Sequence, residues 1–348
     1  MRILVTGGAG FVGSHVAEYY AKRRNEVMLF DNVSRVEILG KSVADPLYNW
    51  NYLSNNYGNI RLVKGDVRNF EEVKAASKDA DAIVHTAGQV AVTTSLRDPR
   101  TDFEINALGT FNVLEAARLN DSAFVFCSTN KVYGENVNMI PVKEEERCYR
   151  FSDEKYANGI PETFPVDLCG HSPYGCSKFA GDIYSQDYAH TYGLKSGVFR
   201  MSCIYGERQF GVEDQGWLSW FVIATLTDRP ITIYGDGKQV RDVLYVGDLV
   251  EAFDMFLDSN LKSEVFNMGG GPKNTLSLLN LLDMLRELTG KNPRVTFSDW
   301  RRADQKVYIS DISKAKRVLN WEPKVDPREG VEGLIKWVSQ NIGLFGKK

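Results

Sequence analysis

A tyrosine and a lysine stand four positions apart in the segment Tyr174-Gly175-Cys176-Ser177-Lys178. On a helix, residues i and i+4 share one face, so this spacing brings the phenol and the ammonium to one site. Because the ordinary pKa of tyrosine is about 10, the phenol needs nearby positive charge to act as a base at neutral pH. We therefore predict that Tyr174 is a general base and acid, with Lys178 as its partner. The alternative for an isolated YxxxK pair is a half-buried tyrosine beside a surface lysine.

A further hydroxyl group is offered by Ser128 or Thr129, which directly follow an apolar segment that predicts a strand. A hydroxyl at this strand end could share the substrate's proton with Tyr174. A serine or threonine in such a place otherwise forms a turn, so the assignment depends on the neighbouring motifs.

Three glycines at three-residue intervals, Gly7, Gly10 and Gly13, lie where the first predicted strand turns into a helix. In a dinucleotide-binding turn the first glycine permits the sharp bend, the second lets the backbone approach the pyrophosphate, and the third allows close helix packing. The start of the helix, with Phe11 and Val12, would offer backbone N–H groups and a positive dipole to the phosphates. The pattern predicts a dinucleotide site.

An acid, Asp31, ends the second predicted strand. A carboxylate there can accept hydrogen bonds from the adenosine ribose and would repel a 2′-phosphate, which favours NAD over NADP. Asn32 and Ser34 belong to the same predicted cofactor site. Arg35 could accommodate a 2′-phosphate, but we give Asp31 more weight.

Segments after the third and fourth predicted strands complete the nucleotide site. Asp66 could meet the adenine amino group and Val67 the ring, whereas Ala87 and Gly88 leave space for the cofactor. The other residues assigned to the cofactor are Gln89, Asn106 and Arg200, together with Tyr174 and Lys178.

Short apolar strands alternate with helices through the first two hundred residues. We predict strands at 2–6, 27–31, 60–63, 82–86, 123–127 and 197–201, and helices near 11–23, 70–78, 101–119 and 174–192. This alternation predicts a Rossmann-type, doubly wound parallel sheet over residues 1–203. Residues 204–348, which include predicted strands at 231–234 and 264–267, should form a smaller, mixed α/β substrate-binding lobe, and the chain could cross between the two. The polar segment 135–172 is predicted to be a solvated insertion loop that borders the active site near Tyr174.

The composition is that of an ordinary globular protein, with 348 residues, 43% hydrophobic and 25% charged. The net charge of −3 gives no general attraction to nucleic acid or to an anionic membrane. No apolar run approaches the roughly 20 residues that a membrane span needs. The five cysteines form no CxxC pair and the four histidines are scattered, so we expect neither a disulfide framework nor a metal. With a strand pattern already at Arg2, we expect a cytoplasmic protein without a signal peptide.

The motifs TGGAGFVG, HTAG, STNKVYG and YGCSK, with the acid at the end of the second strand, resemble the extended short-chain dehydrogenase/reductase family of nucleotide-sugar enzymes. The resemblance spans nearly the whole chain. It implies an NAD-dependent enzyme in which Tyr174 is the base and acid, Lys178 also binds the nicotinamide ribose, and Thr129 is the assisting hydroxyl.

The resemblance leaves several reactions open. Dehydratases of this family resemble one another in an Asp-Glu pair after the Ser/Thr, where this chain has Asn130 and Lys131. Because Asn130 cannot ionise, it cannot protonate a leaving hydroxyl, and a 4,6-dehydratase is disfavoured. A non-catalytic NAD-binding regulator is also disfavoured, since such relatives lack a complete Tyr/Lys/Thr set.

Four phrases favour one kind of epimerase. AGQVAVTTSLRDP, STNKVYG, HSPYGCSK and ERQFGVEDQGW resemble the 2-epimerases of the CDP-paratose/CDP-tyvelose type more closely than the UDP-glucose 4-epimerases. The implied reaction is oxidation of a CDP-hexose at carbon 2 to a 2-keto intermediate, followed by hydride return to the other face. A UDP-hexose 4-epimerase remains the alternative, because the same protein groups serve either carbon.

The candidate substrate-binding residues are polar or aromatic side chains of both regions. Guanidinium groups suit a diphosphate. The candidates are Gln89, Asn130, Arg208, Gln215, Trp217, Tyr234, Arg241 and Arg301. The helices near 101–119 and 174–192 correspond to those of a four-helix dimer interface in the family, which implies a homodimer or homotetramer.

Overall fold

The computed structural model describes residues 1–35, 37, 45–301 and 304–346. The chain forms two compact units. Unit 1 comprises Met1–Val132, Ser172–Arg200 and Val250–Phe266, and unit 2 comprises Tyr133–His171, Met201–Leu249 and Asn267–Lys348. Residues Val250–Phe266 thus belong to unit 1 and Tyr133–His171 to unit 2, so the chain crosses between the units, a possibility that the predicted boundary near residue 203 left open.

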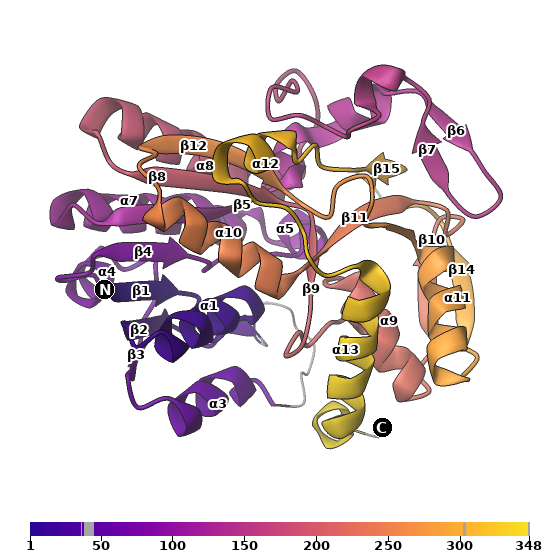
Figure 1. Cartoon of the computed structure of the whole chain (residues 1–348), viewed down its shortest axis with the longest axis horizontal. Helices are drawn as coiled ribbons and strands as arrows, with labels where there is room; N and C mark the ends of the chain where they lie inside the picture. Colours follow the sequence, from indigo (N-terminus) through magenta and orange to yellow (C-terminus); the bar gives the residue numbers. More distant parts are fainter. Residues whose placement is uncertain (36, 38–44, 302–303, 347–348) are drawn as a thin grey trace. The chain divides into compact units, whose positions relative to one another are not determined.

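Unit 1 is built on a seven-stranded sheet with the strand order β12-β8-β5-β4-β1-β2-β3 (Figure 1). The strands are β1 (Arg2–Thr6), β2 (Glu26–Asp31), β3 (Ile60–Lys64), β4 (Ala82–His85), β5 (Ala123–Thr129), β8 (Ser196–Met201) and β12 (Ser263–Met268). The pairs β1/β2, β2/β3, β1/β4 and β4/β5 run parallel. The strand order reverses between β1 and β4, and the carboxyl ends of strands at such a point form the ligand-binding crevice of an open α/β sheet. The predicted Rossmann-type doubly wound sheet is confirmed.

Helices cover both faces of this sheet. They are α1 (Phe11–Lys22), α3 (Tyr48–Asn56), α4 (Phe70–Ala76), α5 (Val92–Arg97), α6 (Pro99–Phe103), the π-helical turn η1 (Glu104–Leu108), α7 (Gly109–Asn120), α8 (Ser172–Tyr192) and α10 (Val246–Asp258). On β8, Val198 joins the core formed with α4, α7 and α8. The next residue, Phe199, contacts Phe253 of α10 with the ring centroids 4.8 Å apart. Successive residues on this strand therefore pack against the helices on opposite faces of the sheet.

Unit 2 contains a small four-stranded sheet and two strand pairs. Its strands are β6 (Val142–Glu144), β7 (Tyr149–Phe151), β9 (Cys203–Tyr205), β10 (Ile231–Tyr234), β11 (Val240–Tyr245), β13 (Thr275–Ser277), β14 (Val295–Ser298) and β15 (Val307–Tyr308). Its helices are α9 (Trp217–Leu226), α11 (Leu278–Thr289), α12 (Ser313–Leu319) and α13 (Pro327–Gln340), with the short 3-10 helices η3 (Glu154–Tyr156) and η4 (Ile342–Phe345). A further 3-10 segment, η2 (Asn130–Met139), runs from unit 1 into unit 2.

The prediction of an insertion loop at 135–172 needs correction. This segment contains the antiparallel hairpin β6/β7 and the 3-10 helix η3. Tyr149 of the hairpin is buried with Val240 and Val307, and Val142 and Phe151 pack against the same cluster. The hairpin therefore contributes to the core of unit 2 through residues that pack on strands far away in the sequence, whereas most of the segment is partly or fully exposed.

Three element assignments also change. The strand predicted at 264–267 lies at the edge of the central sheet as β12, and not in the smaller lobe. The helix predicted at 101–119 consists of α6, the π-helical turn η1 and α7 in direct succession. Strand β5 continues beyond the predicted end at residue 127 to Thr129. The hydroxyl group of the candidate site is therefore held by a regular strand.

Candidate active site

The glycine-rich turn after β1 is fixed by contacts that exclude side chains. Gly7 has a φ of +67°, and a Cβ added there would lie 2.5 Å from the backbone nitrogen of Ala87. A Cβ on Gly13 would lie 2.3 Å from the carbonyl oxygen of Gly7, so the first turn of α1 packs directly on the loop. At Gly10 the nearest atom is again the carbonyl oxygen of Gly7, at 3.0 Å, and the other side is open. The backbone thus offers an exposed approach at the N-terminus of α1, as pyrophosphate binding requires.

Asp31 is oriented by the backbone around it. One carboxylate oxygen accepts a hydrogen bond from the Ala9 N–H (2.9 Å) and the other from the Val33 N–H (2.7 Å). A carboxylate has about four acceptor positions, so positions remain for ribose hydroxyls. Burial raises the pKa of Asp31, and the two backbone hydrogen bonds oppose this shift. The carboxylate is therefore held rigidly beside the glycine-rich turn.

The other predicted adenosine-side residues form a connected group. The Asn32 side chain donates to Asp66 (2.9 Å) and accepts from the Ser34 hydroxyl (2.7 Å). Asp66 also forms a salt bridge with Arg68 at 2.7 Å, and this bond to Arg68 is the main reason why the pKa of Asp66 falls to about 2. The sequence had not singled out Arg68. Burial lowers the pKa of Arg35 to about 10, which leaves its guanidinium charged at neutral pH.

The phenol of Tyr174 lies in a buried site with the predicted partners. Tyr174 is 8% exposed, and its side chain is hydrogen-bonded to Thr129. The Thr129 hydroxyl lies 3.3 Å from the Asn130 side-chain oxygen, so the three residues form one polar group. Burial raises the pKa of Tyr174 to about 12, and the hydrogen bond to Thr129 opposes the shift. Formation of the phenolate therefore depends on added positive charge, which a bound oxidised nicotinamide would supply.

Lys178 is buried almost completely. Its side chain is 6% exposed, and the ammonium lies 4.2 Å from the centroid of the Phe126 ring. Burial lowers the pKa of Lys178 to about 8. A Cβ added to Gly88 would lie 3.9 Å from this ammonium, which places Lys178 next to the predicted nicotinamide side of the cofactor site.

Two predicted ligand-binding amides are engaged within the protein. Both donors of the Gln89 side chain are used, toward the Ala91 carbonyl (2.9 Å) and toward Asp102 (2.7 Å). The Asn106 side chain contacts Gln89, Asp102 and Ser177. The amide donors of Gln89 and Asn106 therefore bind other protein groups around the site. A ligand could only donate a hydrogen bond to the side-chain oxygen of Gln89.

Arg200 also has a protein partner. Its guanidinium forms two hydrogen bonds to the buried Asp182, at 2.9 and 3.0 Å. Asp182 also accepts hydrogen bonds from the Ser128 hydroxyl (2.6 Å) and the Gln186 side-chain amide (2.7 Å). This group ties β8 to α8 and to the strand that carries Thr129. The structure therefore gives Arg200 a positioning function, and its predicted cofactor contact stays a prediction.

The predicted diphosphate-binding arginines lie in unit 2 beside carboxylates. Arg241 forms a salt bridge with Asp304 (2.6 Å), and Arg301 forms one with Asp214 (3.0 Å). The Arg301 guanidinium also lies 3.9 Å from the centroid of the Tyr234 ring, so the structure brings these two predicted residues together. A guanidinium carries five N–H donors, so each arginine keeps donors for a phosphate.

The remaining predicted substrate residues lie elsewhere in unit 2. Arg208 is buried and has a φ of +59°. Gln215 pairs through its backbone with Val212. Trp217 begins α9, and its indole N–H donates to the Cys203 sulfur at 3.3 Å. Their substrate contacts remain predictions.

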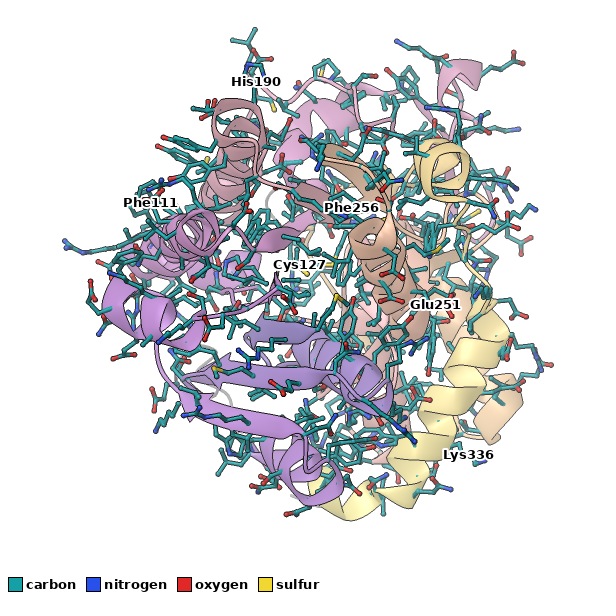
Figure 2. All side chains as sticks on the ribbon, turned by 60° about the vertical axis from the view of Figure 1, so that its left-hand side comes forward. Phe111, Cys127, His190, Glu251, Phe256 and Lys336 are labelled. Atoms are coloured by element: carbon teal, nitrogen blue, oxygen red, sulfur yellow. The ribbon has the colours of Figure 1, made fainter. Side chains whose placement is uncertain are left out.

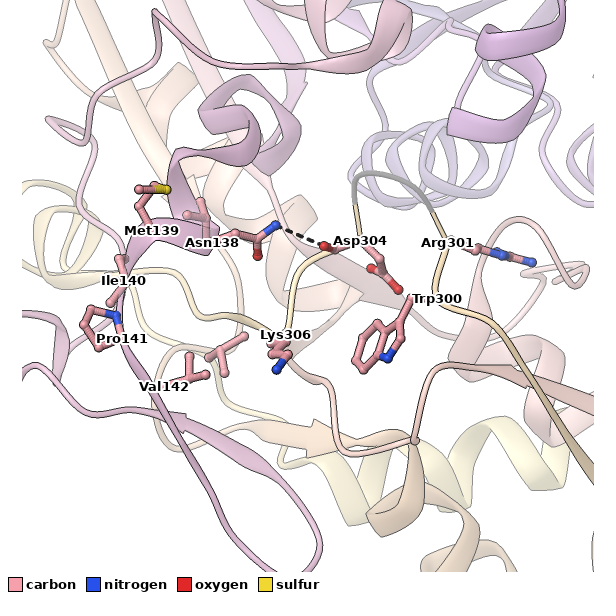
Figure 3. Close-up of a pocket in the computed structure, with 11 residues that line it drawn as sticks. Asn138, Met139, Ile140, Pro141, Val142, Trp300, Arg301, Asp304 and Lys306 are labelled. Atoms are coloured by element: carbon pink, nitrogen blue, oxygen red, sulfur yellow. Dashed lines mark hydrogen bonds between the residues drawn. The ribbon is translucent and has the colours of Figure 1, made fainter.

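A cavity of about 510 Å³ lies within unit 2. Figure 3 shows Asn138 donating to the carbonyl oxygen of Asp304 (3.1 Å) beside it, with Trp300 and Arg301 on the same side as Asp304. The lining residues are Val137, Asn138, Met139, Ile140, Pro141, Val142, Trp300, Arg301, Asp304, Lys306 and Val307. The cavity thus presents an indole, two cationic groups and a carboxylate, a set that suits a phosphorylated aromatic ligand.

Asp102 and Ser177 were missed in the sequence. They are joined by a hydrogen bond of 2.5 Å beneath the Tyr174/Lys178 pair. The available signal was the spacing of Asp102 and Asn106, which puts two polar side chains on one face of a helix. Within the described ranges, no three His, Cys, Asp or Glu side chains gather in a way that could hold a metal ion. None of the described helices is long and apolar enough to cross a membrane.

Several known proteins resemble this chain along nearly its whole length. The chain is 41% identical over 350 aligned residues to the CDP-paratose 2-epimerase of Salmonella typhi, covering 97% of this chain and 99% of that protein. The structure resembles the UDP-glucose 4-epimerase of Thermotoga maritima in complex with UDP-glucose, with a TM-score of 0.81 and 30% identity over 98% of this chain and all of the other. It also resembles the UDP-glucose 4-epimerase of Thermus thermophilus in complex with NAD (TM-score 0.79, 32% identity, 97% of this chain and 99% of the other). The NAD dependent epimerase/dehydratase family model matches residues 3–269. This chain therefore belongs to the NAD dependent epimerase/dehydratase family.

Proposed function

We propose that this chain catalyses the reversible 2-epimerisation of a CDP-activated hexose, of the CDP-paratose/CDP-tyvelose type. The observation that carries the proposal is the 41% identity, along nearly the whole chain, to a CDP-paratose 2-epimerase. The buried Tyr174/Thr129/Lys178 group supplies the side chains that this reaction needs.

NAD, when bound, supplies the hydride acceptor and donor of this chemistry. Tyr174 takes the proton of the sugar hydroxyl while the carbon that bears this hydroxyl becomes a ketone. Tyr174 gives the proton back after the keto sugar has rotated to present its other face. Thr129 holds the phenol and the substrate oxygen in one hydrogen-bonded group. Lys178 stabilises the phenolate with its positive charge. No net oxidation occurs, so NAD should remain bound through the cycle.

Asn130 is the residue that argues against dehydratase activity. It is buried beside Thr129, and its amide can hydrogen-bond a sugar hydroxyl but cannot protonate a leaving group. The second candidate function is a UDP-hexose 4-epimerase, which the likeness to the Thermotoga and Thermus structures favours. Arg241, Arg301 and Tyr234 are the proposed contacts for the nucleotide diphosphate in either case.

The first prediction concerns the cofactor. Asp31→Ala should weaken NAD binding by about 10- to 100-fold, because hydrogen bonds to a charged group contribute about 1.5–3 kcal/mol. Loss of the negative charge should also reduce the preference for NAD over NADP. Titration calorimetry of both cofactors checks this, with Glu26→Ala at the exposed start of β2 as the matched control. Equal affinity of the unaltered protein for NADP and NAD would contradict the role of Asp31.

The second prediction concerns proton transfer. Tyr174→Phe should lower kcat by about 10²- to 10⁴-fold, the usual contribution of general acid–base catalysis, while NAD binding is retained. Lys178→Ala should lower both kcat and NAD affinity, because the proposed ribose contact is lost as well. Steady-state kinetics and bound-NAD analysis measure both effects. Tyr57→Phe, which removes a hydroxyl bonded to Glu18, is the control. Turnover by Tyr174→Phe at the rate of the unaltered enzyme would exclude Tyr174 as the base.

The third prediction concerns the reaction itself. Incubation with CDP-paratose should give inversion at carbon 2, and deuterium placed at that carbon should remain in the product. Direct hydride transfer and return explains the retention, whereas proton abstraction would exchange the label with water. NMR of separate incubations with CDP-paratose and UDP-glucose measures both. Inversion only at carbon 4 of the UDP-sugar would establish the second candidate, and loss of water would establish a dehydratase.

The fourth prediction concerns self-association, which we propose to occur through α7 and α8. Phe111 is 37% exposed on α7 and contacts the exposed Tyr184 of α8, with ring centroids 5.7 Å apart. Figure 2 shows Phe111 at the periphery of unit 1, whereas Cys127 lies in its interior. A second copy could cover this apolar surface. Sedimentation equilibrium should show a homodimer or homotetramer that Phe111→Glu dissociates, whereas Phe297→Glu, at an exposed position of β14, should not. A monomeric unaltered protein would refute the proposal.

A further inference from the structure

We propose that Asp102 is a positioning residue of the Tyr174/Lys178 pair: its buried carboxylate holds the helix that carries both side chains and keeps Lys178 positively charged in an apolar site. The inference rests on the proposed chemistry of this pair. Asp102 lies on α6, outside both the glycine-rich turn and the YxxxK segment in the sequence.

Hydrogen-bond donors surround the buried carboxylate of Asp102: burial raises its pKa, and the hydrogen bonds from Ser177 and Gln89 oppose that shift. The Asp102 side chain is 1% exposed, and it accepts hydrogen bonds from Ser177 (2.5 Å), Gln89 (2.7 Å) and Asn106 (3.1 Å). Both amide groups and the hydroxyl act as donors toward it. Burial of a charged carboxylate costs free energy that only such partners can offset. Three polar side chains in the core therefore direct hydrogen-bond donors at this one carboxylate.

The hydrogen bonds connect Asp102 to the catalytic pair by two routes. Ser177 lies on α8 between Tyr174 and Lys178, and its hydroxyl oxygen is also 3.1 Å from the Tyr174 carbonyl oxygen. Asn106 lies on the other side, where a Cβ added to Gly88 would be 3.0 Å from its oxygen and 3.9 Å from the Lys178 ammonium. The π-helical turn η1 carries Asn106, and π turns of this kind recur at functional sites. Asp102 thus connects α8, through Ser177, to the residues beside Gly88 in the proposed cofactor site, through Asn106.

Three other titratable groups interact electrostatically with Lys178, namely Cys127, Asp182 and His85. Burial raises the pKa of the Cys127 thiol to about 12 and holds the pKa of His85 well below its usual range, so both are neutral at neutral pH. The Asp182 carboxylate is paired with the Arg200 guanidinium in a buried salt bridge.

Among the described groups that raise the pKa of Lys178, Asp102 is then the anion without a guanidinium partner. Asp98 also acts on Asp102, but it is an exposed residue that caps α6. In the proposed arrangement, Asp102 is therefore the counter-charge of the buried ammonium.

The decisive variant is Asp102→Asn, which has nearly the same shape. An asparagine can accept from Gln89 and Asn106 and donate to Ser177, so the network can be retained while the charge is lost. The anion raises the pKa of both Tyr174 and Lys178. Its removal must therefore lower both values, and the bell-shaped pH profile of kcat should move to lower pH by about one unit.

Controls separate this effect from general damage. Asp187→Asn removes one charge from an exposed position of the same helix and should leave the pH profile unchanged. Ser177→Ala breaks the contact to α8 but keeps the charge, so kcat should fall about tenfold without a shift of the profile. An unshifted profile in Asp102→Asn, or an equal shift in Asp187→Asn, would overturn the proposal.

A second measurement does not depend on the sugar. Ionisation of Tyr174 in the NAD-loaded protein can be followed by near-ultraviolet absorbance as the difference from Tyr174→Phe. Asp102→Asn should ionise about one pH unit lower than the unaltered protein. If CDP-hexoses are not substrates but this shift is found, the proposed substrate fails and the function of Asp102 stands. Coinciding titration curves would refute the function of Asp102 whatever the substrate is.

Discussion

The need to keep a lysine ammonium charged inside an apolar layer organises the site. Lys178 lies against the Phe126 ring and is almost fully removed from water, which lowers its pKa to about 8. An ammonium that lost its proton there could no longer stabilise a phenolate. Since desolvation acts on every charge in this layer, the counter-charge must itself be buried and hydrogen-bonded. In the proposed site, this requirement explains why α6, η1 and α8 carry buried polar side chains, namely Asp102, Asn106 and Ser177.

The cofactor side of the site depends on close backbone approach. The start of α1 packs so tightly on the glycine-rich turn that a side chain at Gly13 would overlap the Gly7 carbonyl. Asp31 reaches back to the amide of Ala9 and thereby links the end of β2 to the same turn. The proposed cofactor site and the proposed chemical site adjoin at Gly88, beside which both Asn106 and Lys178 lie. Loss of one hydrogen bond in this region would consequently affect both binding and chemistry.

Two arginine side chains of unit 2 are oriented by neighbouring carboxylates. Arg241 and Arg301 each have a carboxylate partner, and Arg301 also rests on the Tyr234 ring. Such pairing restricts the guanidinium groups before any ligand arrives, while leaving some of their donors available. Positively charged groups held in this manner suit a diphosphate better than freely moving lysines would.

The sequence by itself determined the features that depend on chain-local geometry. The glycine spacing, the acid at the end of β2, the YxxxK helix and most strands were predictable, because each follows from a fixed period or from one turn. The tertiary structure decided what depends on pairing between distant segments. The partner of Arg200 is Asp182, the amide of Gln89 is occupied by Asp102 and Ala91, and Tyr149 of the hairpin within 135–172 is buried against β11 and β15. Strand β12 likewise joins a sheet whose other strands end more than sixty residues earlier. A residue's type indicates that it needs a partner, but only the folded chain determines which partner lies within hydrogen-bonding distance.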